Sequence, residues 1–174
     1  LLQFLQKYDL KVKGMDASEN VVARAHGKGL DVQLGFFGND SGIYKKEEFD
    51  LITCSNVYAH VKKIAPLTRE AWRILKKNGI FLIEVHNAKY LLPDQFDSIY
   101  HEHSVYYDII SITNHLNKNG FNVNKISLED FNSGIYIVSL VNGNSIIILI
   151  IHCLHRLHLL QLIICQILDI KFQT

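Results

Sequence analysis

Four titratable side chains stand next to one another at Tyr100, His101, Glu102 and His103. In extended backbone the two histidines lie on one side and the other two residues lie on the opposite side, whereas a bend in a loop brings Glu102 against His103. A carboxylate beside an imidazole fixes the ring tautomer and raises the basicity of the ring, which a general base working near neutral pH needs. The stretch therefore offers His103 as a base with Glu102 beside it.

Two other interpretations of this stretch stay open. Tyr100 to His103 can be a solvated polar loop, in which the side chains do no chemistry. His-x-His is also part of many metal sites, but no third and fourth ligand stand at a readable spacing, so we predict no metal.

The elements that must position these residues alternate between strand and helix. The alternation predicts a doubly wound α/β sheet that is mostly parallel, with an antiparallel closing strand. Residues 1–8 are expected to be the last turns of a helix. Strands are expected at residues 10–15, 31–37, 49–54, 80–85, 121–126 and 135–141, and helices at about 19–28, 64–77 (closed by Asn78-Gly79) and 108–119.

Length and charge limit the classes of function. The chain has 174 residues, enough for one ordinary domain, and its 18 basic and 17 acidic residues include no basic block. We therefore expect no nucleic-acid partner. Its three cysteines lack zinc spacing, and together with the missing signal peptide they indicate reduced thiols and a cytoplasmic location. The sequence does not indicate an oligomeric state.

In a doubly wound sheet the ligand lies past the carboxyl ends of the strands. Asp16 follows the first of these strands, and its carboxylate can accept both ribose hydroxyls of an adenosine cofactor. The alternative is that Asp16 caps the next helix, although Ser18 could be that cap. The other residues expected at this edge are Phe36 and Phe37, which can sandwich an adenine or belong to the core, then Ser55 and Asn56, and residues 84–87.

Three blocks of the sequence stand out together: Lys-Gly-Met-Asp-Ala-Ser at 13–18, Asn-Val-Tyr-Ala-His at 56–60 and Phe-Leu-Ile-Glu-Val-His at 81–86. They resemble blocks of the class I S-adenosylmethionine-dependent methyltransferases, which have Rossmann-like sheets. Phe-Asp-Ser-Ile-Tyr-His-Glu-His at 96–103 is similar to the signature of the sugar C-methyltransferases, which methylate a carbon of a nucleotide-linked keto-deoxysugar. The resemblance covers about residues 1–130.

The resemblance implies a cofactor, S-adenosyl-L-methionine, and a role for each matching residue. Asp16 would bind the cofactor ribose, and Ser55 and Asn56 would lie on the loop that faces the methionyl part. Phe37, which the resemblance does not assign, is expected beside the adenine ring of the same cofactor. His103 would remove a proton from the carbon next to the sugar ketone, and the enolate would then attack the sulfonium methyl. Glu102 and Tyr100 would position that base or the sugar, and His60 would line the same pocket.

The chain also departs from the family pattern. The first strand and the glycine-rich loop that wraps the methionyl end of the cofactor are expected before Leu1, as is a cysteine-rich zinc-binding segment. Asn132-Ser133-Gly134-Ile135 is a degraded version of the family's Gly-Gly-Ser strand. We therefore interpret residues 1–141 as a partial methyltransferase domain, with little or no activity on its own.

Composition changes abruptly after residue 141. Residues 142–174 are crowded with isoleucine, leucine, histidine and cysteine, but His152, His155, Arg156 and His158 interrupt the apolar run and argue against a membrane span. We interpret this tail as foreign to the fold.

Three other functions remain open from the sequence. The chain could belong to a small-molecule O- or N-methyltransferase of the same superfamily, which needs no base for a carbon acid. It could be a non-catalytic module that binds a nucleotide-linked sugar. A nicotinamide-dependent enzyme would also use Asp16, but nothing else in the chain supports it.

Overall fold

The structure is a computed structural model that describes residues 1–8, 10–39, 42–55, 57–88, 101–128 and 135–141, with only the backbone described for residues 86, 124–128 and 135–141. The predictions for Tyr100, Asn56, the 132–134 segment and the tail at 142–174 lie outside this part. The described residues fall into two compact units, one holding residues 1–43 and the other beginning at Tyr44.

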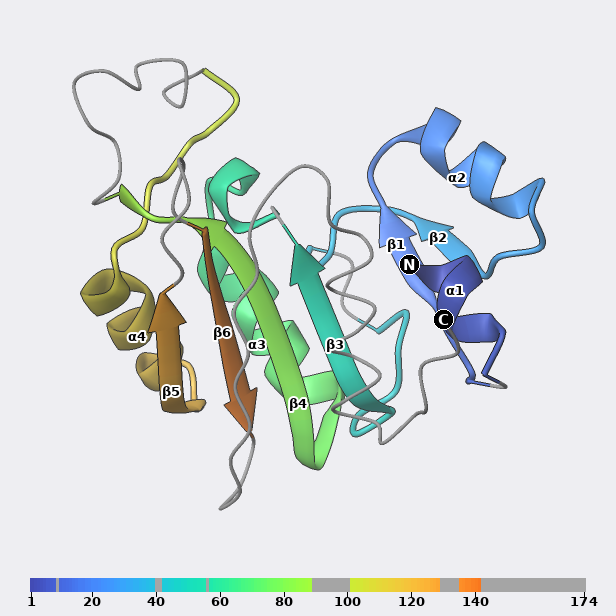
Figure 1. Ribbon diagram of the computed structural model, residues 1–174. Helices are drawn as coiled ribbons and strands as arrows, with labels where there is room; N and C mark the ends of the chain where they lie inside the picture. Colours follow the sequence, from blue (N-terminus) through green and yellow to red (C-terminus); the bar gives the residue numbers. More distant parts are fainter. Residues whose placement is uncertain (9, 40–41, 56, 89–100, 129–134, 142–174) are drawn as a thin grey trace. The chain divides into compact units, whose positions relative to one another are not determined.

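The first unit contains one parallel strand pair and two helices (Figure 1). Its elements are α1 (Leu2–Gln6), β1 (Gly14–Asp16), α2 (Glu19–His26) and β2 (Val32–Leu34), and β1 pairs with β2 from Gly14↔Val32 to Asp16↔Leu34. A Cβ at Gly14 would lie 2.9 Å from the Leu2 side chain and 3.1 Å from that of Val32, so a larger residue at this position would force these side chains to shift. Leu5, Val22 and Val32 form its buried core.

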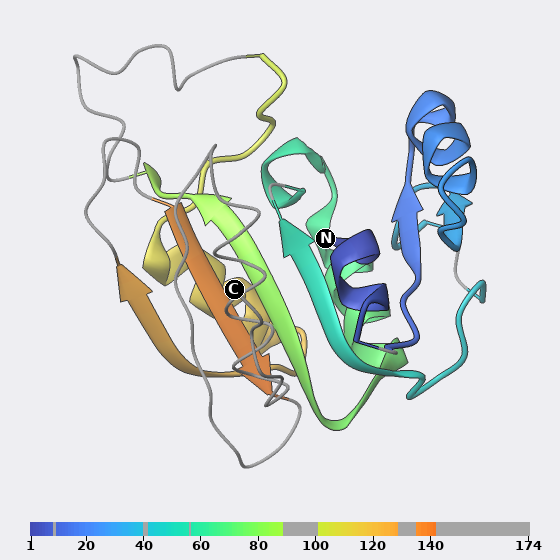
Figure 2. The same ribbon diagram turned by 45° about the vertical axis from the view of Figure 1, so that its right-hand side comes forward.

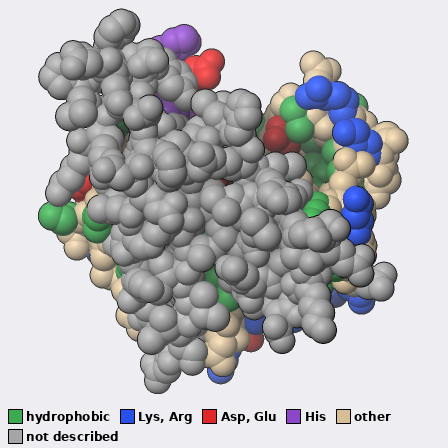
Figure 3. Space-filling view, in the orientation of Figure 1, with side chains coloured by type: hydrophobic (Ala, Val, Ile, Leu, Met, Phe, Trp, Pro, Cys, Tyr) green, Lys and Arg blue, Asp and Glu red, His purple; other side chains and the backbone are tan. Residues whose placement is uncertain are grey.

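The outer side of α2 is polar. Arg24 and Lys28 are exposed, and basic side chains appear at the surface of this unit in Figure 3. Ser18 occupies the N-cap position of α2 in extended backbone, but its side chain makes no cap hydrogen bond. Ser18 therefore occupies the predicted N-cap position, but its hydroxyl does not satisfy a helix N–H group.

The second unit is built on a four-stranded sheet with the order β3-β4-β6-β5. β3 (Phe49–Ser55) runs parallel to β4 (Leu75–His86), and β6 (Ile135–Val141) lies antiparallel between β4 and β5 (Asn122–Leu128). The predicted α/β fold with an antiparallel strand is confirmed, because β6 alone runs against its neighbours in this sheet.

Two helices, α3 (Ile64–Ile74) and α4 (Ile109–Lys118), lie on the same face of this sheet (Figures 1 and 2). Aromatic rings fill the space between them and the strands: the Phe81 ring lies 5.2 Å from that of Phe121 and 6.3 Å from that of Tyr58. The largest fully buried side chains of this unit are Tyr58, Phe81, Phe121, Leu67, Ile74, Leu75, Leu82, Ile83, Ile112 and Leu116.

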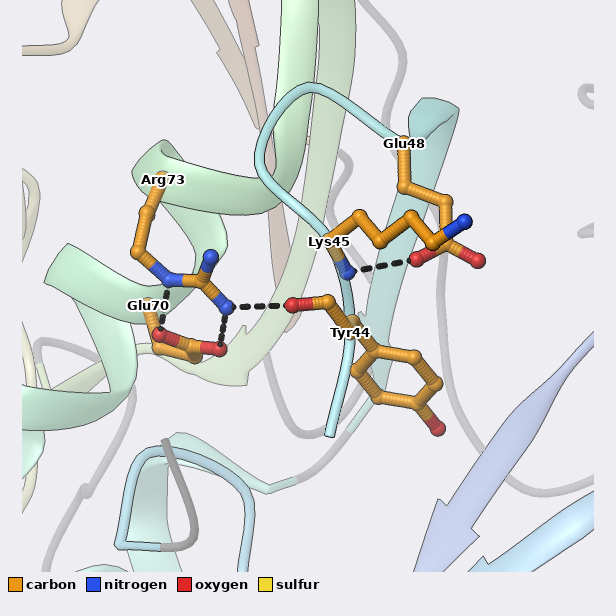
Figure 4. Close-up of polar contacts among 5 residues, drawn as sticks. All are labelled: Tyr44, Lys45, Glu48, Glu70 and Arg73. Carbon is orange, nitrogen blue, oxygen red and sulfur yellow. Dashed lines mark hydrogen bonds and ion pairs between the residues drawn. The ribbon is translucent and has the colours of Figure 1, made fainter. Parts of the chain in front are cut away.

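The segment that leads into β3 is tied to α3. Figure 4 shows Arg73 holding the Glu70 carboxylate through two hydrogen bonds, of 2.6 and 2.8 Å, while its Nη2 also donates to the Tyr44 carbonyl at 2.7 Å. A second contact lies within the segment before β3: the Lys45 N–H donates to the Glu48 carboxylate at 2.7 Å. These contacts lie immediately before β3 in the chain.

The end of α3 differs from the prediction. The helix ends at Ile74, and residues 75–77, expected to be helical, already belong to β4. Pairing of β4 with β3 jumps from Phe49↔Leu75 to Leu51↔Ile80, so residues 76–79 form a bulge. Asn78 adopts a positive φ of 63° there. Asn78-Gly79 therefore turns the chain within a strand rather than ending a helix.

Helix α4 begins with a capping box formed by Asp108 and Ser111. Asp108 Oδ1 accepts from the Ser111 N–H at 2.7 Å, and the Asp108 N–H donates to Ser111 Oγ at 3.0 Å. We expect Asp108→Ala to lower the free energy of unfolding by about 1 kcal/mol, since it leaves helix N–H groups without a partner. Lys63→Ala is the control, because Lys63 is the N-cap of α3 and makes no side-chain cap bond. Urea unfolding of both variants measures the difference, and equal losses would contradict the prediction.

Candidate functional site

The carboxyl ends of the parallel strands β3 and β4 carry a polar pair. Ser55 and Glu84 are register partners, and the Ser55 hydroxyl donates to Glu84 Oε2. Glu84 is only 8% exposed. Burial raises the pKa of the Glu84 carboxyl, and the hydrogen bond from Ser55 acts against that rise. A buried carboxyl thus lies at the strand ends where the sequence predicts the ligand.

The raised pKa of Glu84 predicts how stability depends on pH. A carboxyl whose pKa is higher in the folded state contributes stability below its unfolded pKa, about 4.3 for glutamate, and loses that contribution as the pH rises through the folded value. Glutamine does not ionise, so Glu84→Gln does not lose this contribution. As the pH rises from about 4.3 through the folded pKa of Glu84, the free energy of unfolding of Glu84→Gln should therefore increase relative to that of the original protein. Exposed Glu47→Gln is the control. Thermal unfolding across pH measures the gain, and parallel curves for Glu84→Gln and the original protein would contradict it.

His60 follows β3 and ends the short 3-10 helix η1 (Tyr58–His60). Its ring Nδ1 lies 3.0 Å from the carbonyl oxygen of Glu102. A carbonyl only accepts, so Nδ1 carries the hydrogen, and the neutral ring keeps its lone pair on Nε2. His60 is exposed.

His103 lies directly against His60. The two ring centroids are 4.8 Å apart with the rings at 69°, and His103 is 7% exposed. Tyr106 also packs against His103, with ring centroids 5.4 Å apart. The structure therefore brings together two histidines that stand far apart in the sequence, one buried and one open to solvent.

Glu102 contributes through its backbone to the cluster formed by His60, His103 and Tyr106. Its side chain is exposed, as is that of His101, and histidine and acidic side chains come to the surface together in this unit (Figure 3). The contact of Glu102 with His60 is made by its carbonyl. The role predicted for the Glu102 carboxylate beside His103 stays a prediction, as do the roles of Tyr100 and Asn56, which lie outside the described residues.

The predicted cofactor residues of the first unit lie at the ends of its two strands. Asp16 ends β1, and its Oδ1 accepts from the Ser18 N–H at 2.8 Å. The other carboxylate oxygen has no protein partner among the described residues, so it can accept a hydrogen bond from a ligand hydroxyl, such as one of a ribose. Phe37 is half-buried, whereas Phe36 is 64% exposed and does not belong to the core.

Sequence reasoning missed two parts of the site. Tyr106 was not assigned a role, although an aromatic residue three positions after His103 was a usable signal. It also missed how the segment after β4 reaches the cluster: Asn87 is 1% exposed and forms a bridge with Tyr107, and the Ala88 N–H donates to the Tyr107 carbonyl at 2.7 Å. No local signal shows such a long-range pairing.

Among the residues that the structure describes, no helix has the length and apolar composition needed to cross a membrane. In the same residues no three histidine, cysteine or acidic side chains lie close enough together to hold a metal ion.

Comparison with known proteins identifies the family. The profile of a protein family described as Methyltransferase domain matches residues 1–126. The C-methyltransferase NovU of Streptomyces niveus is 24% identical over 145 residues, covering 79% of this chain and 34% of NovU. The chain thus spans about a third of the length of this curated relative.

Solved structures show the same fold. A SAM-dependent methyltransferase from Archaeoglobus fulgidus superposes with a TM-score of 0.68, at 15% identity over 80% of each chain. A SAM-dependent methyltransferase from Thermotoga maritima, described as a possible histamine N-methyltransferase, gives 0.63 at 17% identity, over 78% of this chain and 75% of its own. Because the family profile spans both strand pairs and the paired histidines, the chain belongs to the Methyltransferase-domain family.

Proposed function

We propose that the whole protein uses S-adenosyl-L-methionine to methylate a carbon next to a ketone in a nucleotide-linked deoxysugar. The observation that carries this proposal is the contact between His60 and His103 in the unit built on β3 and β4. The likeness to a C-methyltransferase supports carbon as the acceptor, and the family together with its SAM-dependent structural relatives implies the methyl donor.

The cluster can handle the proton that this reaction releases. A hydrogen on a carbon next to a ketone is acidic enough for an imidazole to remove if the enolate is stabilised. In the proposal His103 takes this proton, and its burial against His60 and Tyr106 holds the ring in one orientation. His60 presents Nε2 as an acceptor for a hydroxyl of the sugar. Glu102 and Tyr100 are proposed to orient the base or the sugar.

Four residues are proposed to bind the methyl donor. When bound, S-adenosylmethionine supplies an electrophilic methyl group on its sulfonium. Asp16 accepts from the ribose hydroxyls, Phe37 lies against the adenine, and Ser55 and Asn56 face the methionyl part. The single hydrogen bond that Ser18 makes to Asp16 supports this, because it leaves one carboxylate oxygen for the ribose.

Asp16 provides a prediction for cofactor binding. A hydrogen bond to a charged group contributes about 1.5–3 kcal/mol, so Asp16→Ala should weaken S-adenosylmethionine binding by the whole protein at least about tenfold. Titration calorimetry gives the dissociation constant. Asp31→Ala is the control, since Asp31 is an exposed aspartate that precedes β2. An unchanged dissociation constant for Asp16→Ala would remove Asp16 from the cofactor site.

The nature of the product tests the proposed reaction. The whole protein is incubated with a nucleotide-linked keto-deoxysugar and S-adenosylmethionine carrying a ¹³C-labelled methyl group. The ¹³C chemical shift of the product distinguishes methyl on carbon, which we expect, from methyl on oxygen or nitrogen. Transfer to oxygen or nitrogen would overturn the proposal in favour of a small-molecule O- or N-methyltransferase. Binding of the sugar nucleotide without transfer would identify a non-catalytic module.

A further inference from the structure

The helix η1 carries the backbone that places both histidines. His60 is its last residue. The carbonyl of Ala59 accepts from the N–H groups of Ser104 at 2.7 Å and Val105 at 3.2 Å, the two residues that follow His103. Any shift of η1 therefore moves His60 directly and His103 through these two hydrogen bonds.

The first residue of η1, Tyr58, is anchored in the core beneath the cluster. Its side chain is fully buried. Its hydroxyl lies 2.9 Å from Oγ1 of Thr68 on α3, and its ring packs 6.2 Å from that of Tyr107 and 6.4 Å from that of His115 on α4. Tyr58 thus connects η1 to both helices that cover the sheet.

The protons of this buried group can be assigned. The Thr68 hydroxyl donates its one hydrogen to the Ile64 carbonyl at 2.8 Å. Tyr58 must then donate to Thr68 Oγ1, and so must Nε2–H of His115, which lies 2.7 Å away. Burial, and next the charge of Arg69, lower the pKa of His115, so its ring is neutral near neutral pH. All three side chains have a hydrogen-bond partner.

We propose that Tyr58, Thr68 and His115 are positioning residues, which hold η1 so that the His60 and His103 rings keep their edge-on contact. They do not reach the substrate; they act through the backbone of Tyr58 to His60. The contribution to catalysis rests on the proposed function, whereas the contribution to ring geometry does not. None of these three side chains has a role in the proposed reaction itself, since their hydrogen bonds are made to one another and to the Ile64 carbonyl.

The test uses Tyr58→Phe, which removes one hydroxyl and keeps the buried ring. Thr68 then retains Ile64 and His115 as partners, so the variant is expected to fold. The matched control is Tyr44→Phe, at another buried tyrosine of the same unit. A second pair compares Thr68→Val with Thr113→Val, because the buried Thr113 hydroxyl has no hydrogen-bond partner in the described part of the chain.

Two readouts separate positioning from stability. The first is the nuclear Overhauser effect between the His60 and His103 rings, which should weaken in Tyr58→Phe and Thr68→Val and persist in both controls. The second is steady-state kinetics of the whole protein. There kcat should fall about tenfold or more while KM for donor and acceptor stays unchanged, because small misplacements of reacting groups reduce rate strongly.

The outcomes distinguish this inference from the proposed function. A ring contact that is as strong in Tyr58→Phe as in Tyr44→Phe overturns the positioning role. If the contact between the His60 and His103 rings is lost and kcat is unchanged, the contact is not needed for the reaction. If the original protein transfers no methyl group to carbon, the proposed function fails, and the ring contact still decides whether these residues position the histidines.

Discussion

Replacing His103 with glutamine should lower the rate of carbon methylation by the whole protein about 10²–10⁴-fold, the usual contribution of a general base. The reason is that the enolate cannot form at a useful rate without a group to take the proton. Glutamine keeps much of the size and polarity of the ring, so the contacts with His60 and Tyr106 change little. The quantity to measure is kcat with the nucleotide-linked keto-deoxysugar.

His101→Gln is the matched control, because His101 stands two residues away and its side chain is exposed. It should retain most of the activity. A His103→Gln variant that still methylates at nearly the original rate would argue against a carbon-acid mechanism, since an O- or N-methyltransferase does not need this base. A second, independent check is exchange of the sugar's acidic hydrogen with deuterated water, which His103→Gln should slow by a similar factor.

The largest expected loss of stability follows from Phe81→Ala. Phe81 is fully buried on β4, between Phe121 and Tyr58. Removing its ring deletes buried apolar surface and leaves a cavity between the sheet and the two helices, which costs about 3–5 kcal/mol in free energy of unfolding. Since natural domains are stable by only about 5–15 kcal/mol, such a loss can unfold the second unit.

Ile110→Ala is the control for this prediction. Ile110 lies on α4 and is 64% exposed, so its truncation should change the free energy of unfolding by no more than about 0.5 kcal/mol. Chemical denaturation of both variants gives the comparison. Equal losses for Phe81→Ala and Ile110→Ala would mean that the ring of Phe81 does not organise the core of this unit.

Local patterns determined most of the secondary structure. The continuous apolar run around residues 80–85 predicted the central strand, and the residues from Ile135 to Val141 predicted β6 with the bounds that it has. The apolar repeat of Ile109, Ile112 and Leu116 predicted α4, with each end within a residue of the observed one. These signals are local, because hydrophobic periodicity and caps depend on neighbours in the chain. The predicted end of α3 was wrong because Asn78-Gly79 suits both a helix end and a bulge in a strand. Only the pairing of β4 with β3 decides between the two.

The sequence by itself also determined which residue types could do the chemistry: an acid at Asp16, a serine at Ser55 and imidazoles at His60 and His103. Only the tertiary structure decided that the two imidazoles touch, that Glu102 contacts His60 through its carbonyl, and that Tyr58 anchors η1 on Thr68. Each of these contacts joins residues from different elements, so each depends on how β3, α3 and the segment after β4 pack. Long-range packing is set by burial of the whole core rather than by neighbours in the chain, and no local pattern encodes it.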